Sequence, residues 1–124
     1  MTHNPDARTK RNGWIARTLG FAYDAWRVRF DRVGFARSVG ALIGEECRIL
    51  GMTHETFGSE PFLVDVGRHV TICAGVRFIT HDGGVWIFRD AEPNLDVIAP
   101  IRVGNNVFLG LGAIIMPGVT IGNN

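Results

Sequence analysis

IRVGNNVFLGLGAIIMPGVTIGNN, residues 101–124, places an aliphatic residue at every sixth position: Val103, Leu109, Ile115 and Ile121. A glycine follows three of these four residues, and a small or β-branched residue comes four positions after each of the first three. A period of six fits neither an α-helix of about 3.6 residues per turn nor an alternating hairpin strand. It fits a short strand followed by a turn. The stretch therefore predicts a solenoid with the aliphatic residues stacked inside and glycine easing the corners.

The same phase is present earlier in the chain. It covers residues 66–78, VGRHVTICAGVRF, and a shorter stretch at residues 43–49, IGEECRI. The repeat accounts for the sixteen glycines among the 124 residues, a share well above the usual one. An ordinary antiparallel β domain is disfavoured because seven or more hexads share the phase.

These stretches resemble the hexapeptide repeats of left-handed parallel β-helix acyltransferases, in which three hexads make one triangular coil. The resemblance covers roughly residues 39–124, and residues 101–124 are the most similar to sugar and antibiotic O-acetyltransferases. It implies a mainly β fold: a left-handed parallel β-helix with an N-terminal helix and one long extruded loop. Relatives continue for several hexads after a VTIG string, so we expect this chain to be truncated at its C-terminus.

Composition limits the classes of function. With 46% hydrophobic and 20% charged residues, the chain is expected to be one folded domain, not a disordered tail or a membrane bundle. Residues 1–40 carry a net charge of +5 and residues 41–124 a net charge of −4, so the basic excess is confined to one end and does not favour nucleic-acid binding. Cys47 and Cys73 lack metal-ligand spacing. With no secretory signal, we expect a cytoplasmic protein without a metal.

The register breaks between Phe78 and Val103, which are 25 residues apart, one more than four hexads. We expect a loop over residues 81–100 to be extruded here, because charged residues, a Gly pair and prolines do not fit coil interiors. GMTHETFGSEP, residues 51–61, predicts a shorter excursion.

His81 stands at the root of the long loop. In the family that the chain resembles, the catalytic histidine lies where a coil gives way to an extended loop. There it accepts the proton of the acceptor hydroxyl, a task that suits the pKa range of histidine. His81 is therefore the candidate general base. His69 fits a solvated corner, and His54 is a candidate for substrate contact.

Asp82 and Trp86 are candidate substrate-binding residues. Asp82 can orient His81 or contact a sugar hydroxyl, but an Asp before Gly-Gly equally suits a turn. The ring of Trp86 can stack on a sugar face or anchor the loop. Relatives of the maltose and galactoside type carry a His-Pro-x-His string where this chain has THDGG, so the identity of the sugar stays open.

The resemblance implies a donor site for acetyl-CoA along Gly110, Leu111, Gly112 and Ala113. Small residues there let the donor approach closely, and backbone N–H groups can stabilise an oxyanion. The glycines also suit the corners of a solenoid. The resemblance further implies a homotrimer with active sites between coils of neighbouring subunits.

The N-terminal region differs in kind from the repeats. We expect a basic tail without order over residues 1–12 and one amphipathic helix over residues 13–38. Residues 14–37 are predicted to cap the first coil. As an alternative, a basic helix with Trp anchors can lie on an anionic membrane surface, which would place the protein at the inner face of the membrane.

The resulting hypothesis is an acyl-CoA-dependent O-acetyltransferase that acts on a hydroxyl of a saccharide or polysaccharide precursor. An N-acyltransferase for amino sugars and a truncated, non-catalytic oligomerisation or binding module remain as alternatives. A γ-type carbonic anhydrase is disfavoured because the His-x4-His pair of its zinc site is absent.

Overall fold

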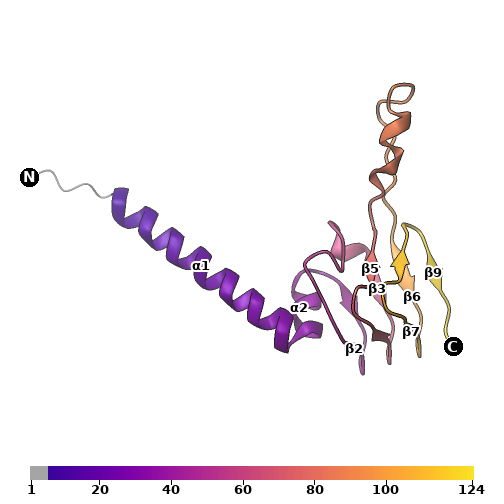
Figure 1. Cartoon of the computed structure of the whole chain (residues 1–124), viewed down its shortest axis with the longest axis horizontal. Coiled ribbons are helices and arrows are strands. Elements are labelled where there is room, and N and C mark those ends of the chain that lie inside the picture. The colour runs from indigo at the N-terminus through magenta and orange to yellow at the C-terminus, as the bar shows by residue number, and fades with distance from the viewer. Residues whose placement is uncertain (1–5) are drawn as a thin grey trace, which may run out of the picture.

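The computed structural model describes residues 6–124 and the side chains from Arg17 onward. In this part of the chain two N-terminal helices precede nine short strands, and all pairs among these strands are parallel. The strands form three sheets, with the orders β1-β3-β6-β9, β2-β4-β7 and β5-β8. Consecutive strands lie in different sheets, so the chain winds in stacked coils (Figure 1). This arrangement agrees with a hexapeptide-repeat β-helix, while its left-handedness stays a prediction.

The strands are two or three residues long: β1 (Leu42–Ile43), β2 (Arg48–Ile49), β3 (Val64–Val66), β4 (Thr71–Ile72), β5 (Arg77–Phe78), β6 (Ile101–Val103), β7 (Phe108–Leu109), β8 (Ile114–Ile115) and β9 (Thr120–Ile121). Short strands separated by turns are what the six-residue period predicts.

The strand register shows where the chain departs from the regular coil. Val103 pairs with Ile121, 18 residues or three hexads further on. Val66 pairs with Val103 at a spacing of 37 residues, and Ile43 pairs with Val66 at a spacing of 23. The extra residues lie in two excursions, one between β2 and β3 and one between β5 and β6. The strands keep their register on both sides of each excursion.

The core lies inside the coils. The aliphatic residues at one position of the hexad are all buried from the third strand to the eighth: Val66, Ile72, Val103, Leu109 and Ile115. Ile121 is partly buried and packs against them. Each fully buried aliphatic or aromatic side chain stabilises the fold by about 1.5–3 kcal/mol. The inward row predicted from the repeat is confirmed.

Glycine at one corner allows successive coils to approach closely. The N–H of Gly44 donates to Val66, that of Gly67 to Val103 and that of Gly104 to Ile121, each at 2.8 Å. A Cβ on Gly67 would stand 2.7 Å from the carbonyl oxygen of Gly104. The glycine after the aliphatic residue is therefore required here by the contact between coils.

The asparagines that follow Gly104 and Gly122 also join successive coils, through hydrogen bonds of their side chains. The side-chain oxygen of Asn105 accepts a hydrogen bond from the N–H of Arg68 at 2.8 Å, and that of Asn123 accepts one from the N–H of Asn105 at 2.6 Å. Each side chain thus satisfies a backbone donor one coil earlier, at a turn where regular strand pairing has ended.

The second excursion contains a 3₁₀-helix, η2 (Gly83–Phe88), and stands away from the strands in Figure 1. The first contains a shorter 3₁₀-helix, η1 (Pro61–Leu63). The first leaves after β2 of the second sheet and the second leaves after β5 of the third sheet, and both return to the coils at the first sheet.

The N-terminal region differs from the single helix expected over residues 13–38. The structure has α1 (Asp6–Phe30) and α2 (Arg32–Ser38), so residues 6–12 are helical, while residues 1–5 of the expected tail lie outside the described residues. The break occurs at Asp31, whose backbone leaves the helical region (φ −134°, ψ 66°). Its carboxylate accepts a hydrogen bond from the N–H of Gly34 at 3.0 Å and so caps a new helix.

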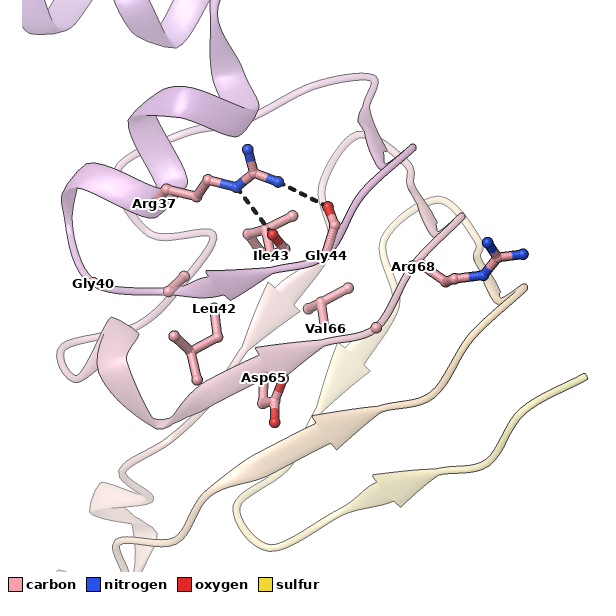
Figure 2. Close-up of a pocket in the computed structure, with 10 residues that line it drawn as sticks. Arg37, Gly40, Leu42, Ile43, Gly44, Asp65, Val66 and Arg68 are labelled. Carbon is pink, nitrogen blue, oxygen red and sulfur yellow. Dashed lines mark hydrogen bonds between the residues drawn. The ribbon is translucent and has the colours of Figure 1, made fainter.

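The capping of the first coil belongs to α2 alone. Phe35 and Ala36 are buried against the coil, and the guanidinium of Arg37 donates to the carbonyl oxygens of Ile43 and Gly44, both at 2.9 Å (Figure 2). By contrast, α1 extends away from the coils in Figure 1. The expectation that residues 14–37 pack on the coil as one helix is wrong for the α1 part.

No helix within the described residues is both long enough and apolar enough to cross a membrane.

Close contact between coils predicts the effect of Gly67→Ala. The added methyl group would meet the Gly104 carbonyl and the Asn105 side-chain oxygen, which stands 2.5 Å from an ideal Cβ. We expect a loss of about 1–3 kcal/mol in the free energy of unfolding, measured by urea denaturation. Gly110→Ala is the matched control, because a methyl group on Gly110 would meet nothing within 4 Å. Equal stability of the two variants would contradict the argument.

Candidate functional site

His81 lies three residues after β5, at the point where the second excursion leaves the coil. The excursion begins and ends as a short antiparallel stem in which His81 faces Ile98. The N–H of Asp82 donates to the carbonyl of Val97 at 2.9 Å, and the N–H of Ala99 donates to that of Thr80 at 3.0 Å. The backbone on both sides of His81 is therefore fixed, although the segment beyond it is exposed.

Asp96, at the returning end of the excursion, contacts the His81 ring directly. Its Oδ1 lies 2.7 Å from Nε2 of His81. The same oxygen accepts the N–H of Val97 at 3.0 Å and lies 3.5 Å from Nη2 of Arg89. Arg89 also donates from Nε to the carbonyl of Leu95 at 3.0 Å. The carboxylate is thus held in place from three sides.

Glu60 brings a second carboxylate to the same ring. Its Oε1 lies 3.5 Å from Nδ1 of His81, which is an ion-pair distance if the ring is protonated, but longer than an ordinary hydrogen bond. Its other oxygen accepts a hydrogen bond of 2.8 Å from the hydroxyl of Thr80, a residue that is 1% exposed. The first excursion therefore contributes to the site formed by the second.

The surroundings of Asp96 alter its pKa. Burial of the carboxyl raises it, and the hydrogen bond from His81 lowers it. The N–H of Val97 and the charges of His81 and Arg89 lower it further, so that the pKa lies below the ordinary value of 3.8. Asp96 is therefore ionised at neutral pH and can only accept a hydrogen bond. When His81 is neutral, its proton is accordingly on Nε2, and Nδ1 carries the free lone pair.

Asp82 and Trp86 do not contact the His81 ring. The carboxylate of Asp82 accepts a hydrogen bond from the N–H of Gly84 at 2.9 Å and caps η2. The sequence allows Asp82 to act as a partner of His81, as a ligand of a sugar hydroxyl or as a turn residue, and its hydrogen bond with Gly84 supports the role in the turn. Trp86 lies on η2 with its side chain 71% exposed, so it does not anchor the loop and remains available to a ligand.

The candidate donor segment, Gly110 to Ala113, forms the turn between β7 and β8. Gly112 has a positive φ of 68°, which favours glycine, and Leu111 is 79% exposed. The segment lies at a different corner from His81. Within this chain the structure does not bring the two candidate sites together.

The other histidines with described side chains have different surroundings. His69 occupies a left-handed turn position (φ 56°) and lies 3.0 Å from the side-chain oxygen of Asn106 through Nδ1, as expected for a corner residue. His54 is exposed and packs edge-on against Phe35, with ring centroids 6.1 Å apart. No group of three histidine, cysteine or acidic side chains among the described residues is placed to hold a metal ion.

A groove of about 540 Å³ lies over the outer face of β1 and β3, beside α2 (Figure 2). Leu42, Asp65 and Arg68 contribute to its lining together with Arg37. Because Arg37 already donates to two carbonyl groups, it serves the packing of α2. None of the candidate site residues lines this groove.

Asp96 and Glu60 are the residues that the sequence interpretation did not identify. Both stand close to the end of an interruption in the hexads, just before the chain returns to a coil. That shared position is a signal available in the sequence, because both interruptions return to strands that pair in the first sheet.

Comparison with known proteins agrees with this architecture. The family described as hexapeptide repeat of succinyl-transferase matches residues 100–124. Protein CapG of Staphylococcus aureus is 57% identical over 84 residues, which make up 68% of this chain and 49% of that protein. The chain thus spans about half the length of this relative. No solved structure gives a significant match.

The parallel coils, the family match and the similarity to Protein CapG agree with one another. Residues 100–124 are thus hexapeptide repeats of the kind described for succinyl-transferases, and 68% of the chain is similar to Protein CapG.

The contacts of Asp96 predict its titration. In carbon-detected NMR, its carboxyl should titrate below 3.8, and the midpoint should rise in His81→Ala because a hydrogen bond and a charge that lower the pKa are removed. The stabilisation linked to Asp96 is present above its unfolded-state pKa and is lost as the pH falls through the folded-state value. His69→Ala, which alters another corner, is the control. An unchanged midpoint in His81→Ala would refute the contact.

Proposed function

We propose that the protein transfers an acyl group, most simply acetyl, from acyl-CoA to a hydroxyl of a saccharide or polysaccharide precursor, with His81 as the general base. The observation that carries this proposal is the bond between Nε2 of His81 and Oδ1 of Asp96 at 2.7 Å. It orients a partly exposed imidazole at the mouth of an excursion from a rigid solenoid. A histidine oriented by a carboxylate is a general arrangement for base catalysis.

In the proposed step, Nδ1 of His81 accepts the proton of the acceptor hydroxyl while that oxygen attacks the thioester carbonyl carbon. The carbon–sulfur bond then breaks, and the CoA sulfur takes the proton from the imidazolium. Asp96 holds the proton on Nε2 throughout, and Glu60, 3.5 Å from Nδ1, stabilises the transient positive charge. The backbone N–H groups of residues 110–113 are the proposed donors to the oxyanion.

A saccharide acceptor is supported by two features. The sequence pattern of residues 101–124 resembles that of sugar O-acetyltransferases, and the exposed ring of Trp86 on η2 offers a flat surface for a sugar face. Hydroxyl and amino-sugar acceptors, offered in parallel, would distinguish O-transfer from N-transfer. A protein that uses acyl-CoA works where that donor is made, which agrees with the cytoplasmic location expected from the sequence.

Hexapeptide-repeat proteins commonly form trimers, and we propose the same assembly here. Phe108, Leu111 and Ile114 expose apolar side chains on the outer side of the coils near the donor segment. Contact with a second copy would cover this surface. It would also allow His81 of one subunit and the donor segment of another to meet, as the proposed reaction requires.

His81→Ala tests the proposal in the whole gene product. Transfer of labelled acetyl groups from acetyl-CoA to saccharide should fall by roughly two to four orders of magnitude, the usual contribution of a positioned base. Binding of acetyl-CoA should change little, because residues 110–113 supply the donor site. His54→Ala and His69→Ala should each keep most of the activity. Transfer at nearly the parental rate by His81→Ala would overturn the proposal.

Asp96→Asn tests how His81 is oriented. The amide can donate to Nε2 and favour the wrong tautomer, so we expect kcat to fall about tenfold or more, while KM for acetyl-CoA stays close to its parental value. Asp82→Asn is the matched control: it removes a charge from the same excursion, but its amide oxygen can still cap η2. Equal losses in the two variants would show that Asp96 acts only through loop structure.

A further inference from the structure

α1 carries a row of large side chains that nothing in the described structure covers. Leu19, Tyr23, Trp26 and Phe30 are 65%, 58%, 53% and 70% exposed. Their spacing of four, three and four residues places them on one face of a helix. Tyr23 and Trp26 have ring centroids 6.4 Å apart, and Trp26 and Phe30 have centroids 5.8 Å apart. We call these four residues the aromatic stripe.

Arginines flank the aromatic stripe. At about 100° per residue, Arg27 and Arg29 lie on opposite sides of it, and Asp24 lies well away from it. Arg27 lies above the Tyr23 ring, 5.7 Å from the centroid, and 3.6 Å from Asp31. The stripe is thus bordered by positive charge on both sides.

The arginines of α2 serve a different purpose. Arg32 donates to the carbonyl of Ile49 at 3.2 Å, and Arg37 donates to carbonyls of the first coil. They join α2 to the solenoid. Consequently the solenoid is anchored by α2, and α1 is left projecting from it with the aromatic stripe exposed (Figure 1).

The charges of Arg27 and Arg29 distinguish two partners that could cover the aromatic stripe: α1 of a second copy and an anionic lipid surface. Parallel pairing of α1 with α1 from a second copy would bring Arg27 of one helix close to Arg29 of the other, and the repulsion disfavours that contact. An anionic lipid surface instead attracts Arg27 and Arg29. Tyr and Trp suit the boundary between headgroups and acyl chains, while arginines beside them reach the lipid phosphates.

We propose that α1 docks on an anionic membrane surface, with the aromatic stripe in the interface and Arg27 and Arg29 against the lipid phosphates. The helix lies in the plane of the surface and does not cross it. α2 then holds the solenoid, with its two excursions, next to the membrane.

The test is flotation of the complete chain with vesicles of phosphatidylcholine, with or without phosphatidylglycerol. We expect binding to the vesicles that contain phosphatidylglycerol, and weakening by salt and by Arg27→Gln/Arg29→Gln. In a Trp14→Phe/Trp86→Phe background, Trp26 fluorescence should shift to shorter wavelength on binding. No flotation with anionic vesicles would overturn the proposal.

The matched variants are Trp26→Ser/Phe30→Ser in the stripe and Phe21→Ser on the opposite face, where the side chain is 71% exposed. The stripe variant should bind anionic vesicles at least about tenfold more weakly, because two large side chains no longer enter the interface. Phe21→Ser should bind nearly as the parent does. Equal loss in both variants would overturn the proposal.

Sedimentation velocity without lipid provides the remaining comparison. The parent and the stripe variant should have the same oligomeric state. If the stripe variant alone dissociates, the stripe contacts a second copy and the proposal is wrong. Circular dichroism of both variants establishes whether α1 is still helical. Serine is used in both variants because its intrinsic helix propensity is then the same for each substitution.

Discussion

Backbone hydrogen bonds between successive coils, such as the 2.8 Å bond from Gly67 to Val103, determine the remainder of this structure. They set each coil directly upon the next, so that equal positions of the hexad lie above one another. The aliphatic residue then stacks into a continuous core. The glycine beside it leaves room for the neighbouring carbonyl, and the asparagine after it accepts a corner N–H. One constraint thus accounts for most of the composition of the repeat.

The same stacking explains how three distant residues meet at the candidate site. Glu60 belongs to the first excursion, whereas His81 and Asp96 stand at the two ends of the second. Both excursions return to the coils at the first sheet, through β3 and β6, which pair with each other. The coil supplies the fixed positions, and the loops supply the polar side chains.

The sequence could predict the features that follow from the six-residue period. The inward positions from Val66 to Ile115 and the place of His81 follow directly from the phase and its interruption. The partner of His81 could not be deduced in this way, because spacing along an irregular loop does not show that residue 96 returns to residue 81. Asp31 was missed for another reason: the apolar pattern of a helix continues through it, and only the cap to Gly34 divides α1 from α2.

The location of the excursions has an evolutionary consequence. Spacings of 23, 37 and 18 residues separate equivalent strand positions, yet the first sheet continues through all of them. Insertions before a strand of the first sheet therefore change the length of chain around His81 without breaking the pairing of that sheet. A lineage could exchange or lengthen these segments and acquire new acceptors while the solenoid stayed as it is. These two segments are places where new specificity can arise with little risk to folding.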